Sequence, residues 1–126
     1  MSEPLQPALT AYNEAAAATF TKYFKPSLDA CSGVSFQLVF GAIVGTVAIY
    51  ISNDSRAQSD MDNGTTTADW TDITSSLTAI GIGNPAGVAG STLWNIGNLR
   101  TAFLKFVYTH GSGTAYGRLH YCAVGH

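Results

Sequence analysis

The residues best suited to chemistry are carboxylates in one polar stretch, SNDSRAQSDMDNGTTTADWTD, that follows an apolar segment. It holds five of the eight acidic residues of the chain, Asp54, Asp60, Asp62, Asp69 and Asp72. Carboxylates bind calcium, but an EF-hand loop also requires glycine at position 6 and glutamate at position 12. Counted from Asp60, those positions hold Thr65 and Thr71. We therefore predict a solvated loop, with Asp60, Asp62 and Asp69 as candidates for an irregular calcium site.

Two glycine-rich segments resemble phosphate-binding loops, GIGNPAG at 81–87 and GSGTAYG at 111–117. In both, the third glycine comes one residue later than the dinucleotide-binding fingerprint requires, and neither segment opens a predicted helix. Both are therefore predicted to be turns, and we expect no cofactor.

The histidines show no catalytic pattern. A nucleophilic site needs a nucleophile, a base and an orienting group. His110 falls in a predicted turn, His120 on the last predicted strand and His126 at the terminus, and none has a flanking motif such as G-x-S-x-G or H-E-x-x-H. We nominate no catalytic residue and expect that the chain is not an enzyme.

Aromatic residues offer a different chemistry, the stacking of sugar rings. The candidates for such a platform are Tyr50, Trp70, Trp94, Tyr116 and Tyr121. Aromatic residues at strand ends more often fill a core, where they bury a large apolar area. We therefore expect both tryptophans in the core.

Composition and charge limit the partners. A chain of 126 residues is most simply one domain. Its net charge is −2 and its basic residues are scattered, which argues against a nucleic acid partner. Charged residues make up 11% of the chain, against roughly 25% in typical soluble domains. This favours a protein that buries much of its outer surface in an assembly, a small uncharged monomer being the alternative.

Residues 33–52 have the length of a membrane span, but they include Ser35, Gln37 and three glycines and lack a basic flank. We predict two strands there and no membrane partner. The first residues have neither the basic nor the apolar region of a secretory signal. Cys31 and Cys122 are predicted to be two buried thiols, with one bridge between an early strand and the last as the alternative.

Apolar and polar residues alternate at period two in several segments, which is typical of strands with one buried side. The sets that share a face are Phe36, Leu38 and Phe40; Val47, Ile49 and Ile51; Leu104, Phe106 and Tyr108; and Leu119, Tyr121 and Ala123. Glycine turns at 41–45 and 111–113 predict that these strands form two hairpins. A further strand is expected over 69–77.

Residues 1–17 carry Pro4, Pro7 and a run of alanines, and they predict an extended N-terminal arm. Residues 18–126 form the domain. No stretch of twelve or more residues shows an amphipathic helix pattern. About six to eight strands separated by turns predict an all-β fold, an antiparallel β-sandwich of jelly-roll-like form.

Three segments together resemble small β-sandwich virion structural proteins of tailed bacteriophages: SFQLVFGAIVGTVAIYISND, DWTDI, and LWNIGNLRTAFLKFVYTHGSGTAYGRLHY. In that pattern an S-N-D strand end leads through a variable loop to a W-x-x-I strand, followed by a V-x-Y-T strand and an S-G-T turn. The matching positions are Ser52, Asn53, Asp54, Trp70, Ile73, Val107, Tyr108, Thr109, Ser112, Gly113 and Thr114. The resemblance covers about residues 34–124, and the proline-bearing arm and the final Gly125-His126 depart from it.

The resemblance implies a capsid decoration (cement) protein, head spike or tail component, located in the virion and assembled in the host cytoplasm. Its implied partners are the major capsid protein or other virion proteins, with the chain as a homo-oligomer of threefold or similar cyclic symmetry. The acidic stretch would be a variable loop, and the arm would clamp a neighbour. The domain also resembles galactose-binding-type sandwiches, in which S-N-D leads into a similar loop. The alternative function is therefore carbohydrate binding for host recognition, using Trp70 or Trp94 with the acidic loop and calcium.

Overall fold

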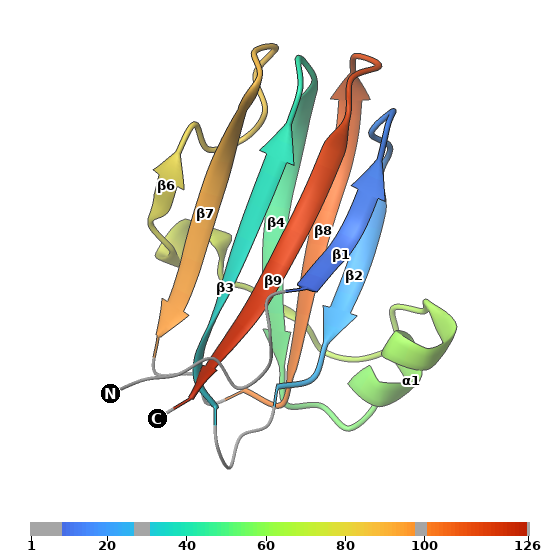
Figure 1. Cartoon of the computed structure of the whole chain (residues 1–126). Coiled ribbons are helices and arrows are strands. Elements are labelled where there is room, and N and C mark those ends of the chain that lie inside the picture. Colours follow the sequence, from blue (N-terminus) through green and yellow to red (C-terminus); the bar gives the residue numbers. More distant parts are fainter. Residues whose placement is uncertain (1–8, 27–30, 98–100, 126) are drawn as a thin grey trace.

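The computed structural model describes residues 9–26, 31–97 and 101–125, which form two antiparallel sheets packed face to face (Figure 1). The strands are β1 (Leu9–Glu14), β2 (Phe20–Phe24), β3 (Cys31–Phe40), β4 (Val44–Ser52), β5 (Thr71–Asp72), β6 (Ala79–Gly81), β7 (Gly90–Gly97), β8 (Phe103–Ser112) and β9 (Gly117–Gly125). A helix, α1 (Ala57–Asn63), joins β4 to β5, and a 3-10 turn, η1 (Thr74–Ser76), joins β5 to β6. The predicted all-β sandwich is confirmed.

The strand order is that of a jelly roll. One sheet has the order β1-β9-β3-β7-β6 and the other β2-β8-β4-β5. Without the short edge strand β6, eight strands remain. They pair first with last, second with seventh, third with sixth and fourth with fifth. A long hairpin rolled into two sheets has this pairing, which confirms the jelly-roll-like prediction.

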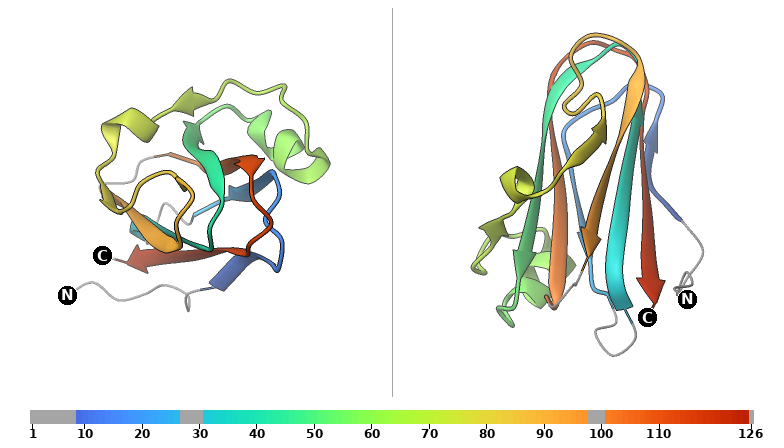
Figure 2. Two further views of the ribbon diagram at one scale, coloured as in Figure 1. Left: turned by 90° about the horizontal axis from the view of Figure 1, so that it is seen from above. Right: turned by 90° about the vertical axis from the view of Figure 1, so that its left-hand side faces the viewer.

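Both predicted hairpins are wrong. Strand β3 lies in the five-stranded sheet while β4 lies in the four-stranded one, and β8 and β9 are separated in the same way. Their connections arch over one end of the sandwich (Figure 2). Two strands that each have an apolar face can bury these faces across a core as well as side by side. Period-two alternation is the same in both cases, so it does not distinguish an arch from a hairpin.

The predicted apolar faces form the core between the sheets. Phe36 is fully buried, with its ring centroid 5.4 Å from that of Phe106 on the facing sheet. Phe24 stacks on Tyr121 at 4.2 Å. Trp94 is 3% exposed and meets Phe106 edge to face, which confirms its predicted place in the core. These contacts join strands from both layers.

The N-terminal segment differs from the predicted arm. Leu9–Glu14 form β1 and pair with β9, so this part of the arm is an edge strand of the five-stranded sheet. Tyr12 anchors it, because its ring stacks on Phe20 with centroids 3.8 Å apart. The rest of the predicted arm before residue 9 lies outside the described residues.

Helix α1 was missed by the sequence reading. It has seven residues, of which only Ala57 and Asp60 are buried. A helix this short presents too few apolar positions for a period of 3.6 residues to emerge. Its end is nevertheless readable, since Gly64 follows it in the left-handed conformation, with φ 67°.

The structure also bears on two alternatives from the sequence, a membrane span over residues 33–52 and a disulfide between Cys31 and Cys122. Most of residues 33–52 form β3 and β4, which belong to different sheets. Among the described residues, no helix is long and apolar enough to cross a membrane. Cys122 is a free, half-buried thiol, so the alternative bridge is not formed. The side chain of Cys31 lies outside the described part of the chain.

Gly45 provides a test of core packing. A methyl group at this position would meet the ring of Tyr108, which is 1% exposed. Gly45→Ala should therefore destabilise the fold by about 1–3 kcal/mol through overpacking. Gly97→Ala is the matched control, because no described residue lies within 4 Å of its added methyl group. Its effect should stay within about 0.5 kcal/mol. Urea unfolding followed by fluorescence measures both, and equal losses would contradict the proposed crowding.

Candidate functional site

The acidic stretch folds back on the outer side of the four-stranded sheet (Figure 1). Most of its side chains are exposed, but Ala57 and Asp60 are fully buried. The amide of Ala57 donates to the carbonyl of Asp54 at 2.9 Å, and that of Gly64 donates to Asp60 at 2.8 Å. The predicted solvated loop is therefore in part a packed unit with an interior of its own.

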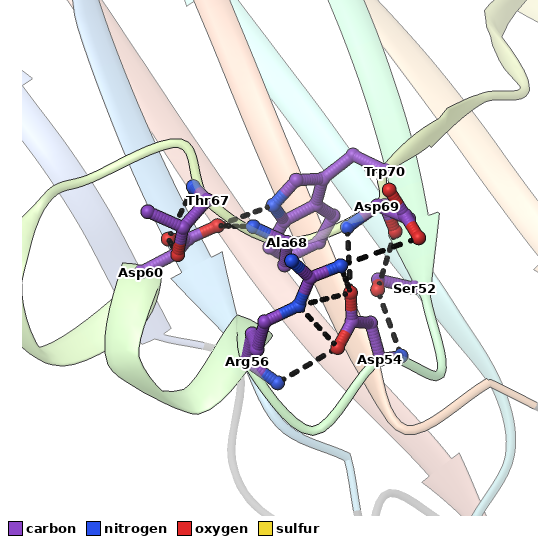
Figure 3. A network of polar contacts seen from close by, with 8 residues as sticks. All are labelled: Ser52, Asp54, Arg56, Asp60, Thr67, Ala68, Asp69 and Trp70. Carbon is purple, nitrogen blue, oxygen red and sulfur yellow. Dashed lines mark hydrogen bonds and ion pairs between the residues drawn. The ribbon is translucent and has the colours of Figure 1, made fainter.

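Asp60 is the centre of this unit (Figure 3). Its Oδ1 accepts from the Thr65 hydroxyl at 2.7 Å and from the Thr67 amide and hydroxyl, both at 2.8 Å. Its Oδ2 accepts from the Ala68 amide and from the Trp70 indole nitrogen, both at 2.9 Å. One buried carboxylate thus gathers the returning segment from residue 65 to residue 70.

The protonation of Asp60 follows from these contacts. Burial by itself would raise the pKa of the carboxyl group, since the charged form loses hydration. The hydrogen bonds from Thr65, Trp70, Thr67 and Ala68 outweigh burial and hold the pKa of Asp60 well below its usual range. Asp60 is therefore an anion at neutral pH, and its charge is needed to accept all five bonds.

A second carboxylate closes the base of the loop. Asp54 accepts from Arg56 Nη2 at 2.7 Å and from the Asp69 amide at 2.8 Å (Figure 3). The Arg56 hydrogen bond, followed by the backbone bonds, holds the pKa of Asp54 well below its usual range. Ser52 donates to the Asp69 carbonyl at 2.7 Å and accepts from the Asp54 amide at 3.0 Å. Because Arg56 is largely exposed, its ion pair with Asp54 contributes little to the stability of the fold, although it helps to fix the conformation of the loop.

Lys105 lies beneath the loop on the outward side of β8. It is 8% exposed, and its Nζ is 4.6 Å from the ring centroids of both Tyr50 and Trp70. Tyr23 and Tyr50 are its register partners on the neighbouring strands. Burial lowers the pKa of Lys105, while the charge of Asp60 opposes that shift. The outer face of this sheet therefore holds a cation enclosed by aromatic rings.

The three candidate calcium ligands are used in different ways. Both oxygens of Asp60 already accept hydrogen bonds from the protein. Asp62 accepts from Gln58 on the same helix at 3.1 Å. Asp69 has a side chain that is 93% exposed, 3.4 Å from Arg56. Across the described residues, no three His, Cys, Asp or Glu side chains gather as a metal site would require.

Of the aromatic candidates, Tyr50 and Trp70 both contact Lys105, and the other three lie elsewhere. Trp94 and Tyr121 are buried in the core. Trp70 was predicted there too, but it lies on the outer face of the sheet, half-buried, because its indole N–H bonds Asp60. Tyr50 faces Lys105, and Tyr116, 38% exposed, lies 4.9 Å from the guanidinium of Arg118. They do not form one platform.

The histidines make separate local contacts. His110 Nε2 donates to the Gly113 carbonyl at 2.9 Å, and its Nδ1 pairs with the Tyr108 hydroxyl at 2.9 Å. His120 pairs with the Thr10 hydroxyl at 3.1 Å. His126 lies outside the described residues. His110 lies in β8 and not in the predicted turn, and its contact with Gly113 ties the end of this strand to the arch between β8 and β9.

No protein-family model matches the chain, and no curated protein matches it significantly. The site and the fold define a jelly-roll sandwich with a charge-stabilised loop on one outer face.

Two features of the site are not evident from the sequence. The carboxylates near Asp60 indicate a metal ligand, but the run Thr65 to Thr67 beside it is also a set of hydroxyl and amide donors suited to an anion. Period two places Lys105 on the face opposite Leu104 and Phe106, but its burial depends on Trp70, which comes from a distant loop. The only local sequence signal of this burial is that the lysine has an apolar residue on each side.

Asp60→Asn tests whether the Asp60 carboxylate holds the loop together. The amide nitrogen that replaces one oxygen cannot accept, so two donors lose their partner if it takes the place of Oδ2 and three if it takes the place of Oδ1. We expect the melting temperature at pH 7 to fall by about 5–10 °C. Asp62→Asn is the matched control, because this carboxylate is exposed and accepts a hydrogen bond from Gln58 within its own helix. Thermal unfolding followed by circular dichroism compares the two. A similar small shift in both variants would contradict a structural role for Asp60.

The pKa direction of Asp60 gives a pH test. Its folded pKa lies below the unfolded value of about 4. The stability it contributes is therefore complete above about pH 4 and is lost as pH falls below that value toward the folded pKa. The difference in melting temperature between the wild type and Asp60→Asn should narrow between pH 6 and pH 3. A constant difference would show that the folded carboxyl has an ordinary pKa.

Proposed function

We propose that the chain is a structural protein of a bacteriophage virion, a capsid decoration or spike protein that binds the capsid surface as a homo-oligomer. The observation that supports this proposal is a jelly roll with a filled interior. Coat proteins, lectins and cupins all use jelly rolls, so strand order alone does not separate these roles.

The interior argues for a scaffold. A jelly roll that binds a small ligand needs a concave site with convergent polar groups. Here the space between the sheets is filled by side chains such as Phe36, Phe40, Phe106 and Tyr108, which are at most 1% exposed. An open hollow beside β6 and β7 is lined by uncharged residues, including Leu77, Ile80 and Asn95. These features suit a protein that acts through its outer surface.

The loop supports the same role. The carboxylates of Asp54 and Asp60 accept hydrogen bonds from the loop's own groups, which leaves a rigid, folded excursion on one outer face. Charged residues make up only 11% of the chain. Surfaces with few charges are well suited to burial against other subunits.

Capsid binding is tested directly by co-sedimentation. The purified chain is mixed with intact capsids of the phage that encodes it, stripped of this protein, and the pellet is quantified. Before mixing, light scattering gives the mass of the purified chain in solution. We expect a discrete oligomer that pellets with the capsids at a fixed, saturable stoichiometry. Capsids of an unrelated phage serve as the control. A chain that stays in the supernatant at every concentration would contradict the proposal and direct attention to ligand recognition.

The predicted role of the arm is tested in the same assay. A deletion through residue 17 would remove β1 and damage the sheet. Deletion of residues 1–8 keeps every described strand, so the circular dichroism spectrum should stay unchanged. We expect this truncation to bind capsids less tightly. Full binding would show that the arm does not clamp a neighbour.

A further inference from the structure

One end of the sandwich forms a distinct surface, which we call the loop cap. It consists of four connections, 15–19, 41–43, 82–89 and 113–116. They join β1 to β2, β3 to β4, β6 to β7 and β8 to β9, and they lie together at the top of Figure 1 and of the right-hand view in Figure 2. Helix α1 lies toward the opposite end.

Backbone hydrogen bonds between the connections make the loop cap one unit. The Ala17 amide donates to the Ala115 carbonyl at 2.9 Å, which joins the first connection to the last. The Gly41 amide donates to the Tyr116 carbonyl at 3.0 Å. The Gly87 amide donates to the Ile43 carbonyl at 2.8 Å. Because each connection is held by its neighbour, the surface is already ordered before any partner arrives.

The loop cap carries no formal charge. Its four segments, AAAAT, GAI, IGNPAGVA and GTAY, hold no Lys, Arg, Asp or Glu, and all of their residues are described. Four large apolar side chains are exposed on it or at its border: Val44 by 43%, Ile82 by 43%, Val88 by 58% and Tyr116 by 38%. Most other side chains there are alanine or glycine, which lose little or no rotamer freedom when buried.

The charges lie elsewhere. Five of the eight acidic residues belong to the loop that contains α1 and to β5. At the strand ends next to the loop cap, Glu14 and Arg118 contribute one charge of each sign, and Lys22 and Lys105 lie farther along β2 and β8. A chain with net charge −2 therefore presents an end without excess charge.

We propose that the loop cap is the surface through which copies of this chain associate with one another. This inference rests on the proposed function, because it names the surface that forms the oligomer. Rotational symmetry brings identical residues close to one another near the axis, so charged residues there would repel their own copies. An ordered, uncharged and partly apolar surface meets a copy of itself without that cost, whereas the acidic end does not.

Val88→Asp tests the proposal, since Val88 is the most exposed large apolar residue of the loop cap. The variant should raise the dissociation constant of the oligomer about tenfold or more, measured by light scattering over a dilution series. Val88→Thr keeps the shape without a charge and should retain the wild-type mass. Thr66→Asp adds the same charge at an exposed position of the acidic loop and should also retain it. Circular dichroism confirms that each variant is folded.

Two results would overturn the inference: a wild type that is monomeric at all concentrations, or a folded Val88→Asp variant with the wild-type mass and dissociation constant. Capsid co-sedimentation separates this failure from that of the proposed function. A monomeric wild type that still pellets with capsids removes the loop cap as a self-association surface and leaves capsid binding intact. An oligomer that Val88→Asp dissociates, but that ignores capsids, supports the loop cap and contradicts the virion role.

Discussion

The packing of two sheets through their aromatic inner faces is the constraint on which the rest of the structure depends. Phe36 and Phe106 face each other across the layers, and Trp94, Phe24 and Tyr121 extend the contact along the core. Each strand contributes alternate residues to this interior, so its other residues must face outward. The chain changes sheets at most of its connections, and that alternation fills the interior and produces the jelly roll.

Residues on the outward faces of the sheets are covered by other parts of the chain or exposed to solvent. On the four-stranded sheet, Lys105 lies outward on the central part of β8 and is covered by Trp70. Trp70 is held there by Asp60, whose carboxylate also binds the segment that leads back to the sheet. A buried anion is costly unless it is fully hydrogen-bonded. Asp60 meets that condition, and it holds part of the polar insertion over Lys105 on the outer face of the four-stranded sheet.

The two ends of the sandwich differ in chemistry because different connections of the chain lie at each end. Connections made of alanine, glycine and small polar residues meet at one end, while the charged insertion after β4 emerges at the other. This difference in charge between the two ends supports the proposed role, in which the chain contacts copies of itself and other subunits through extended surfaces. Such contacts need no concave pocket. The filled interior and the low charge favour the proposed scaffold over a site for chemistry.

The sequence by itself determined the fold class, the alternating faces of β3, β4, β8 and β9, and the burial of Trp94, because period two and apolar content are local properties. It did not determine which strands are neighbours, since hairpin and arch share one pattern. Nor did it identify the partners of Asp60 and Lys105. Those contacts join residues from separate segments, and only the tertiary structure brings them close enough for a hydrogen bond or a ring contact to decide their place.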